Sequence, residues 1–201
     1  MLKTRSAVVL MAALAATVRM SAGQLLPEPN AWKIDPAHSG ASFAVRHLMI
    51  STVRGKLGPV TGAVWYDGAN VAGIRAEASI DVSKVNTGED ARDNDLRGAD
   101  FFDVRRFPAI KFKSKRAVPG ADGHFSLVGD LTIRDVTKEV TLDVEGPSPI
   151  LKTQREQRTV AAATVTINRF DYGLKWNQLV ETGGAVVGPD VKVTIDLEVI
   201  R

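Results

Sequence analysis

Residues 191–200 read VKVTIDLEVI, with an apolar side chain at every second position and polar ones between. Successive side chains on a β-strand point to opposite faces, so this stretch predicts a strand with one apolar and one wet face. Such strands are typical of antiparallel sheets, which face a core on one side and water on the other. The same period of two recurs at residues 74–81, 110–115, 125–133, 140–145 and 163–168.

Short segments rich in Gly, Pro and Asp separate these runs, for example Pro119–Gly123 and Gly188–Asp190. We count about eight strands over roughly 170 residues, with no internal repeat and no linker. The predicted fold class is therefore all-β, and alternation alone leaves a sandwich and a barrel open. An eight-stranded antiparallel barrel is just wide enough to be filled by side chains or to hold one small ligand.

Residues 87–97, TGEDARDNDLR, break the alternation and are dense in charge. Thr87 is predicted to cap one short helix here, because the acidic residues that follow would lie at its positive N-terminal end. Phe101 and Phe102 come next. The helix and its aromatic turn would lie across a barrel mouth, or form an ordinary crossover whose Phe side chains fill core.

Composition excludes several classes of protein. The chain has no cysteine, so disulfides and Cys-based metal sites are excluded. Of its 26 basic residues, three (Lys3, Arg5 and Arg19) lie in the first 23 positions, which leaves 23 basic against 23 acidic residues. That balance does not support nucleic acid as a partner.

The first 23 residues resemble a secretory signal peptide. Lys3 and Arg5 precede the apolar run Ala7–Val18, and Ser21-Ala22-Gly23 supplies small residues for cleavage. The run is short for a membrane span, although an uncleaved anchor or a buried N-terminal helix is the alternative. We expect residues 24–201 to form one exported domain, periplasmic or secreted and not integral to a membrane, although transient membrane contact is compatible with this.

The sequence argues against two chemical alternatives. Asp35, His38 and Ser39 suggest a hydrolytic triad, but neighbours on a strand point apart, so His38 and Ser39 are poorly placed to bond each other. The spacing of His38, His47 and His124 matches no strong metal template. We therefore predict no metal, no cofactor and no catalytic residue.

Several motifs together resemble the YceI family of bacterial exported lipid-binding proteins. The resemblance spans about residues 32–200 and is carried by motifs in the family's order. They are Trp32–Asp35, His38-Ser39, Arg46–Leu48, Arg92-Asp93, Leu96-Arg97, Ala99–Asp103, Gly129–Ile133, Val136–Lys138 and Asn168–Gly173.

The resemblance implies a lipocalin-like, extended eight-stranded barrel with one short helix between strands. It also implies non-enzymatic binding, for sequestration or transport, of a long-chain isoprenoid such as a quinone precursor or a prenyl phosphate. His47, Arg92 and Asp93 are the polar candidates for its head group. The apolar candidates for the cavity lining are Phe43, Val45, Phe101, Phe102, Ile110, Phe112, Leu131, Ile133, Val165 and Ile167.

The sequence departs from the family at Asp95, which stands where the family's Arg-Asp-x-His-Leu signature has His. If that His holds an anionic head group, Asp95 removes a donor and adds repulsion, which favours a neutral head such as a quinone.

Two other functions stay open at this point. One is an enzyme acting on a prenylated or acylated lipid, with His47, Arg92 and Asp93 as its polar cluster. The other is a partner that delivers quinone to a membrane electron-transfer protein. The sequence also leaves the oligomeric state open, a homodimer included.

Overall fold

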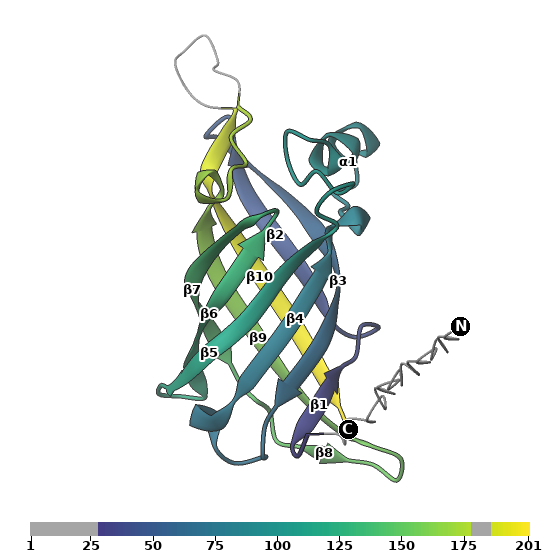
Figure 1. The fold of residues 1–201 in the computed structure, drawn as a ribbon, viewed down its shortest axis with the longest axis vertical. Helices are drawn as coiled ribbons and strands as arrows, with labels where there is room; N and C mark the ends of the chain where they lie inside the picture. The colour runs from purple at the N-terminus through teal and green to yellow at the C-terminus, as the bar shows by residue number, and fades with distance from the viewer. Residues whose placement is uncertain (1–27, 178–185) are drawn as a thin grey trace, which may run out of the picture.

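The computed structural model describes residues 28–177 and 186–201, whose strands form one antiparallel sheet of ten (Figure 1). The longer strands are β2 (Gly40–His47), β3 (Ser51–Trp65), β4 (Arg75–Asp81), β5 (Ala109–Pro119), β6 (His124–Ile133), β7 (Val136–Glu145), β9 (Gln157–Asn168) and β10 (Val187–Ile200). Two short strands, β1 (Ala31–Ile34) and β8 (Leu151–Lys152), attach to this set.

The eight longer strands close into a barrel because β10 pairs with two partners. Val193 of β10 lies opposite Phe43 of β2 on one side and opposite Val165 of β9 on the other. The chain order β2 to β7 and then β9 supplies the remaining neighbours. The predicted all-β fold of eight antiparallel strands is therefore confirmed.

The two ends of the barrel differ, and we name them by their elements. The β1 end carries β1, β8 and the 3-10 helix Val71–Gly73 (Figure 1). The α1 end carries the helix α1 (Asp90–Arg97), the β2–β3 turn and the 3-10 helix Arg169–Tyr172. A third 3-10 helix, Val82–Lys84, connects β4 towards α1.

The predicted short helix is confirmed, but its cap is not Thr87. The N-cap residue is Glu89, whose side chain makes no capping hydrogen bond. Thr87 instead donates from its backbone N–H and its hydroxyl to the Asp93 carboxylate, at 2.8 and 2.6 Å. Thr87 therefore ties the segment before the helix to the first turn of α1.

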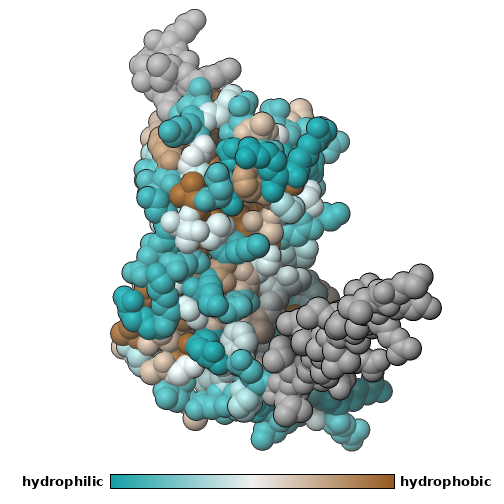
Figure 2. All heavy atoms as spheres, viewed as in Figure 1, coloured by the Kyte–Doolittle hydropathy of each residue, from teal (hydrophilic) through white to brown (hydrophobic). Residues whose placement is uncertain are grey.

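The alternation puts apolar side chains inside and polar ones outside, with a change of parity in β3 and another in β5 between Ser114 and Ala117. Gly55 and Leu57 face inward, and beyond the irregularity at Gly58 the inward residues are Val60 and Val64. A bulge adds one residue to a strand and so reverses the alternation beyond it. The face of the molecule seen in Figure 2 is mainly hydrophilic, with hydrophobic residues in small groups.

The predicted signal peptide, residues 1–23, lies outside the described residues. In the described part of the chain, no helix has the length and apolar character needed to cross a bilayer.

Candidate ligand-binding site

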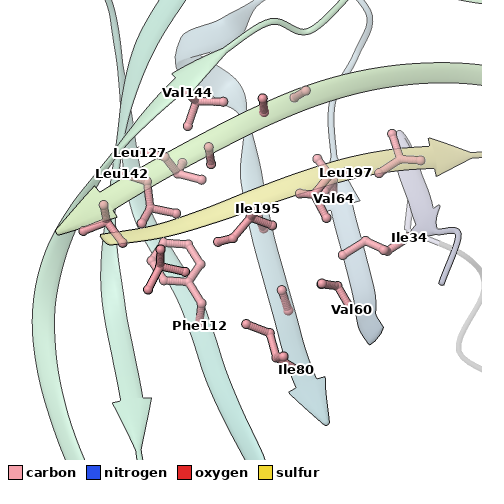
Figure 3. Close-up of a pocket in the computed structure, with 18 of the residues that line it drawn as sticks. Ile34, Val60, Val64, Ile80, Phe112, Leu127, Leu142, Val144, Ile195 and Leu197 are labelled. Atoms are coloured by element: carbon pink, nitrogen blue, oxygen red, sulfur yellow. The ribbon is translucent and has the colours of Figure 1, made fainter. Parts of the chain in front are cut away.

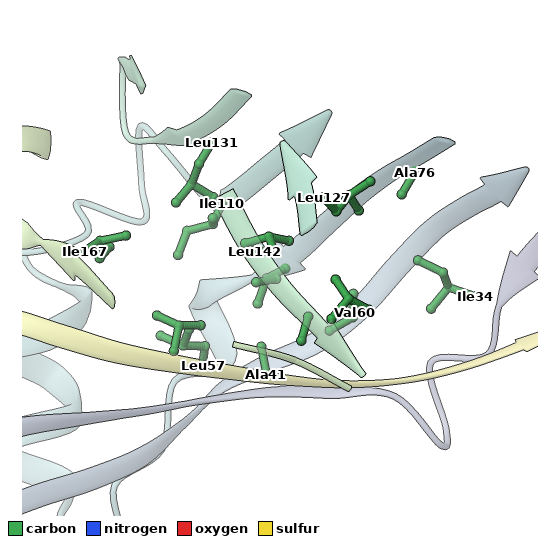
Figure 4. Close-up of a cluster of buried hydrophobic side chains, with 14 of the residues drawn as sticks. Ile34, Ala41, Leu57, Val60, Ala76, Ile110, Leu127, Leu131, Leu142 and Ile167 are labelled. Atoms are coloured by element: carbon green, nitrogen blue, oxygen red, sulfur yellow. The ribbon is translucent and has the colours of Figure 1, made fainter. Parts of the chain in front are cut away.

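A cavity of about 120 Å³ lies inside the barrel and is walled by apolar side chains from facing strands (Figure 3). Ile80, Phe112 and Ile195 point toward it from β4, β5 and β10. A close-up of the surrounding core shows the same inward arrangement for Ile110, Leu131 and Ile167 (Figure 4). The cavity wall is therefore formed by the inward-facing side chains of the alternating strands.

Only two of the lining residues, Tyr66 and Thr159, carry polar side-chain atoms. The Thr159 hydroxyl donates to the Ser148 carbonyl oxygen at 2.8 Å. Burial raises the pKa of the Tyr66 phenol, and Asp67 adds to the effect. The wall thus presents neither a charged group nor an activated nucleophile to a bound molecule.

Six of the ten predicted lining residues face this cavity. They are Ile110, Phe112, Leu131, Ile133, Val165 and Ile167. Their contact with a ligand stays a prediction. Phe112 is seated over Gly129, where an added Cβ would come within 2.6 Å of the ring. Glycine there makes room for the ring on the neighbouring strand.

The other four predicted lining residues lie outside the cavity wall, all of them half-buried. Phe43 and Val45 are on the inward side of β2, and the Phe43 ring lies over Gly55. Phe101 and Phe102 follow α1 and pack against the edge of the core.

Sequence reasoning did not name Leu57, Val60 and Val64 of β3 as lining residues. These residues show no single period of two, because the bulge at Gly58 changes their parity. Ile80 and Val193 also line the cavity and lie in clear alternating runs, so the signal to find them was present.

Trp32 closes the barrel at the β1 end. Its side chain is fully buried, and its indole N–H donates to the Tyr66 carbonyl oxygen at 2.9 Å. It lies opposite Val64, which faces inward, so the indole fills the interior beneath the cavity. The guanidinium of Arg201 lies 4.3 Å from the ring centroid.

Arg169 organises one loop at the α1 end. It is only 4% exposed and donates to the backbone carbonyls of Leu174, Trp176, Val187 and Gly188. Burial lowers the pKa of its guanidinium. The four carbonyls replace the water that the cation loses on burial.

A second loop meets the first at this end. The Phe101 and Trp176 rings lie 5.3 Å apart, and Arg134 donates to the Phe101 carbonyl oxygen at 3.2 Å. Two buried donors here, Arg134 Nε and the Tyr172 hydroxyl, have no hydrogen-bond partner among the described residues. Burial raises the pKa of Tyr172 to about 12, with Asp171 as the lesser cause.

The predicted polar residues on α1 are engaged in holding its own loop. Arg92 donates to the Thr87 hydroxyl and carbonyl oxygens, at 2.7 and 3.2 Å. Asp93 is 1% exposed and accepts from Thr87, whose hydroxyl is the main cause of the lowered pKa of Asp93. In the described part of the chain, no hydrogen bond or ion pair joins His47 to either residue. Asp95 is exposed on α1 and is not among the cavity's lining residues.

Asp35, His38 and Glu198 gather at the β1 end, with possible ligand atoms within 4.8 Å of one another. The Arg158 guanidinium bonds Glu198 and lies 3.6 Å from Asp35, so the cluster already holds a cation. Ser39 bonds the backbone of Glu198 and not His38. Both residues lie before β2 and not on a strand, so the predicted separation holds but strand alternation is not its cause. His38 pairs with Asp35, and His124 pairs with Asp143. Among the described residues, the three histidines do not gather at one site.

The β2–β3 turn exposes three consecutive apolar residues. Leu48, Met49 and Ile50 are 37%, 53% and 80% exposed. Leu48 and Met49 have φ values of 52° and 61°, in the left-handed region. That conformation costs about 1–2 kcal/mol for each residue with an L side chain.

The family of YceI-like domains matches residues 32–199. The UPF0312 protein SAB2563 of Staphylococcus aureus (strain bovine RF122 / ET3-1) is 40% identical over 168 residues, covering 82% of this chain and 94% of the relative. Another relative, the UPF0312 protein SA2479 of strain N315, is 39% identical over the same length and coverage.

Solved structures share the fold. BcnA of Burkholderia cenocepacia matches with a TM-score of 0.69 at 22% identity, covering 82% of this chain and 98% of BcnA. A polyisoprenoid binding domain from Saccharophagus degradans matches with a TM-score of 0.61 at 18% identity, covering 84% of this chain and 97% of that domain.

Proposed function

The chain belongs to the family of YceI-like domains, and we propose that its barrel binds the hydrocarbon chain of an isoprenoid lipid without reacting with it. The observation that carries the proposal is the apolar cavity inside the barrel, whose wall holds no charged side chain. The polyisoprenoid binding domain named among the structural neighbours supports the ligand class. We also propose that the protein is exported and acts by sequestering or carrying this lipid.

The cavity volume bounds the part of the ligand that fits. About 10–15 Å³ holds one water-sized group, so about 120 Å³ holds roughly ten, the length of about two isoprene units. Burying about ten methylene groups contributes roughly 8 kcal/mol before the ligand's ordering costs. A longer chain requires the loops at the α1 end to move, or extends past them.

The head group would lie at the α1 end, since Trp32 closes the other. Among the described residues, Arg134 Nε and the Tyr172 hydroxyl are buried donors without a partner, and a quinone or phenol oxygen could accept from them. Tyr172→Phe removes only the hydroxyl. If that hydroxyl has no ligand role, its loss leaves affinity unchanged; if it bonds the head group, affinity falls about fivefold.

The direct test is to purify the exported form, extract it with organic solvent and identify the released molecule by mass spectrometry. Ala163→Phe fills the cavity, whereas Thr164→Phe puts the same ring on the outer face of β9. We expect an intact prenyl lipid from the wild type and from T164F, and none from A163F.

Thermal unfolding confirms that each variant is folded, and Ala161→Leu is the milder filling variant if A163F is not. An empty wild type that also rejects added prenyl lipids would overturn the proposal. A chemically altered lipid would favour an enzyme instead.

A further inference from the structure

We infer that the β2–β3 turn, residues 48–50, is a docking tip that inserts into an anionic lipid bilayer and sets the α1 end of the barrel on its surface. The inference rests on the proposed function, because a lipid carrier must reach the membrane that holds its ligand.

The first observation is the exposed apolar surface of the docking tip. Met49 is 53% and Ile50 80% exposed, and both are neighbours of the 37% exposed Leu48. Single exposed apolar residues are ordinary on soluble proteins, but three in a row at the end of a hairpin are a local patch. Side chains of this kind contribute to interfacial binding in proportion to the apolar area they bury in the bilayer.

The second observation is the backbone of the docking tip. The Ile50 N–H donates to the His47 carbonyl oxygen at 3.2 Å, which closes a turn with Leu48 and Met49 at its centre. Both central residues have positive φ, the arrangement in which hairpins strongly favour Asn and Gly. Leu48 and Met49 therefore disfavour the turn conformation that they adopt. Strain of this kind clusters at functional sites.

The third observation is the charge behind the docking tip. Arg54 and Lys56 are exposed on the outer face of β3 and line an open groove with Lys192 of β10. Within the described residues, no carboxylate forms an ion pair with any of the three. At about 3.3 Å per strand residue, Arg54 lies about 13 Å behind Ile50. A tip inserted about 5–10 Å would bring this cation to the lipid phosphates.

Arg46 holds the docking tip in shape. Its guanidinium donates to the Met49 carbonyl oxygen and to the Thr52 hydroxyl. The apolar side chains are thus presented by an ordered turn, which reduces the ordering cost of insertion.

The docking tip also lies at the appropriate end of the molecule. The Leu48 N–H donates to the Val186 carbonyl oxygen, and His47 lies opposite Val187. The Val187 carbonyl oxygen accepts a hydrogen bond from Arg169. Val186 and Val187 therefore lie beside the docking tip. Docking through the tip would place the α1 end, and not the Trp32 end, at the bilayer.

The test is co-sedimentation of the exported form with vesicles of phosphatidylcholine alone or mixed with phosphatidylglycerol. The exported form is required because the apolar run of residues 7–18 would itself bind lipid. L48N/M49G places the preferred residues in the turn, so its stability should be equal or higher. Leu151→Asn is the matched control, because Leu151 is 62% exposed at the β1 end.

We expect wild type and L151N to bind the mixed vesicles and L48N/M49G to bind about tenfold or more weakly. Arg54→Gln should bind the mixed vesicles about fivefold more weakly at low salt, and this loss should shrink at high salt. Equal vesicle binding by wild type and L48N/M49G, or no binding by wild type, would overturn the inference. The inference would also be overturned if light scattering showed that the docking tip joins two copies of the chain and the protein did not bind vesicles.

The same samples separate this inference from the proposed function. A protein that retains lipid but ignores vesicles contradicts the docking tip alone. A protein that docks on vesicles but contains no lipid, with A163F docking equally well, contradicts the proposed lipid carriage. The inference about the docking tip is then unaffected.

Discussion

The two ends of the barrel are closed by different chemistry. At the β1 end a buried indole, Trp32, fills the interior. At the α1 end, arginines hold two loops by donating to backbone carbonyls: Arg169 bonds Leu174, Trp176, Val187 and Gly188, and Arg134 bonds Phe101. Removing the indole loses buried apolar area, whereas a carbonyl released by arginine is solvated by water. The α1 end is therefore the one that opens at lower cost, and the following variants test that difference.

The largest effect is expected at the β1 end. Trp32→Ala removes a fully buried indole and should lower the free energy of unfolding by about 3–5 kcal/mol. Trp176→Ala, at the half-buried Trp of the α1 end, should cost about 1 kcal/mol. Urea unfolding followed by circular dichroism measures both. Equal losses for the two variants would contradict the comparison.

Arg169→Met comes next. It leaves four carbonyls without their donor, and we expect a loss of about 3 kcal/mol together with opening of the α1 end. Hydrogen exchange should rise in residues 174–177 and 186–188, while the amides around Trp32 stay protected. Uniform loss of protection in both regions would show that the ends do not open separately.

Phe101→Ala should affect the passage of ligand more than stability. The variant loses the ring contact with Trp176, worth about 1 kcal/mol. If the two loops gate the cavity, the release rate of a bound prenyl lipid rises about fivefold. Phe170→Ala removes a 38% exposed ring that packs over the Arg169 guanidinium at the same end, and it controls for the loss of an aromatic ring there. An unchanged release rate in F101A would place the route elsewhere.

The smallest effect is a pH dependence confined to the β1 end. The 2.8 Å hydrogen bond between His38 and Asp35 raises the pKa of His38 and lowers the pKa of Asp35, with Arg158 and Glu198 adjacent. The His38 contribution is complete below its ordinary pKa of 6.5 and is lost as pH rises through its folded value. The Asp35 contribution is complete above 3.8 and is lost as pH falls through its folded value.

Wild type should therefore exceed His38→Asn in melting temperature most clearly between about pH 4 and 6.5 and lose that advantage at alkaline pH. Thermal unfolding across this range measures the difference. At the α1 end, the lowered pKa of Asp93 affects stability only under more acidic conditions, so Asp93→Asn should show a constant difference from pH 5 upward. A His38→Asn difference that does not change with pH would exclude the pair as its source.

The polar residues of α1 show where sequence reasoning reached its limit. Arg92 and Asp93 were predicted as head-group candidates, and both are bonded to Thr87. A motif identifies which residues stand together in the chain, but a hydrogen-bond partner depends on how a loop folds back on its helix. The turn of the docking tip could not be predicted from the sequence either, because Leu48 and Met49 are unfavourable at its two positive-φ positions.

The sequence by itself determined which side of most strands faces inward, because alternation is a local property with a period of two. The sequence predicted the all-β class, the inward positions of Ile110, Leu131 and Val165, and the family through its motifs. Only the tertiary structure decided that β10 closes the ring against β2 and β9, since residues 40–47 and 187–196 are far apart in the chain. It also decided that the interior is partly hollow, because a cavity depends on how side chains from opposite walls fill the space between them.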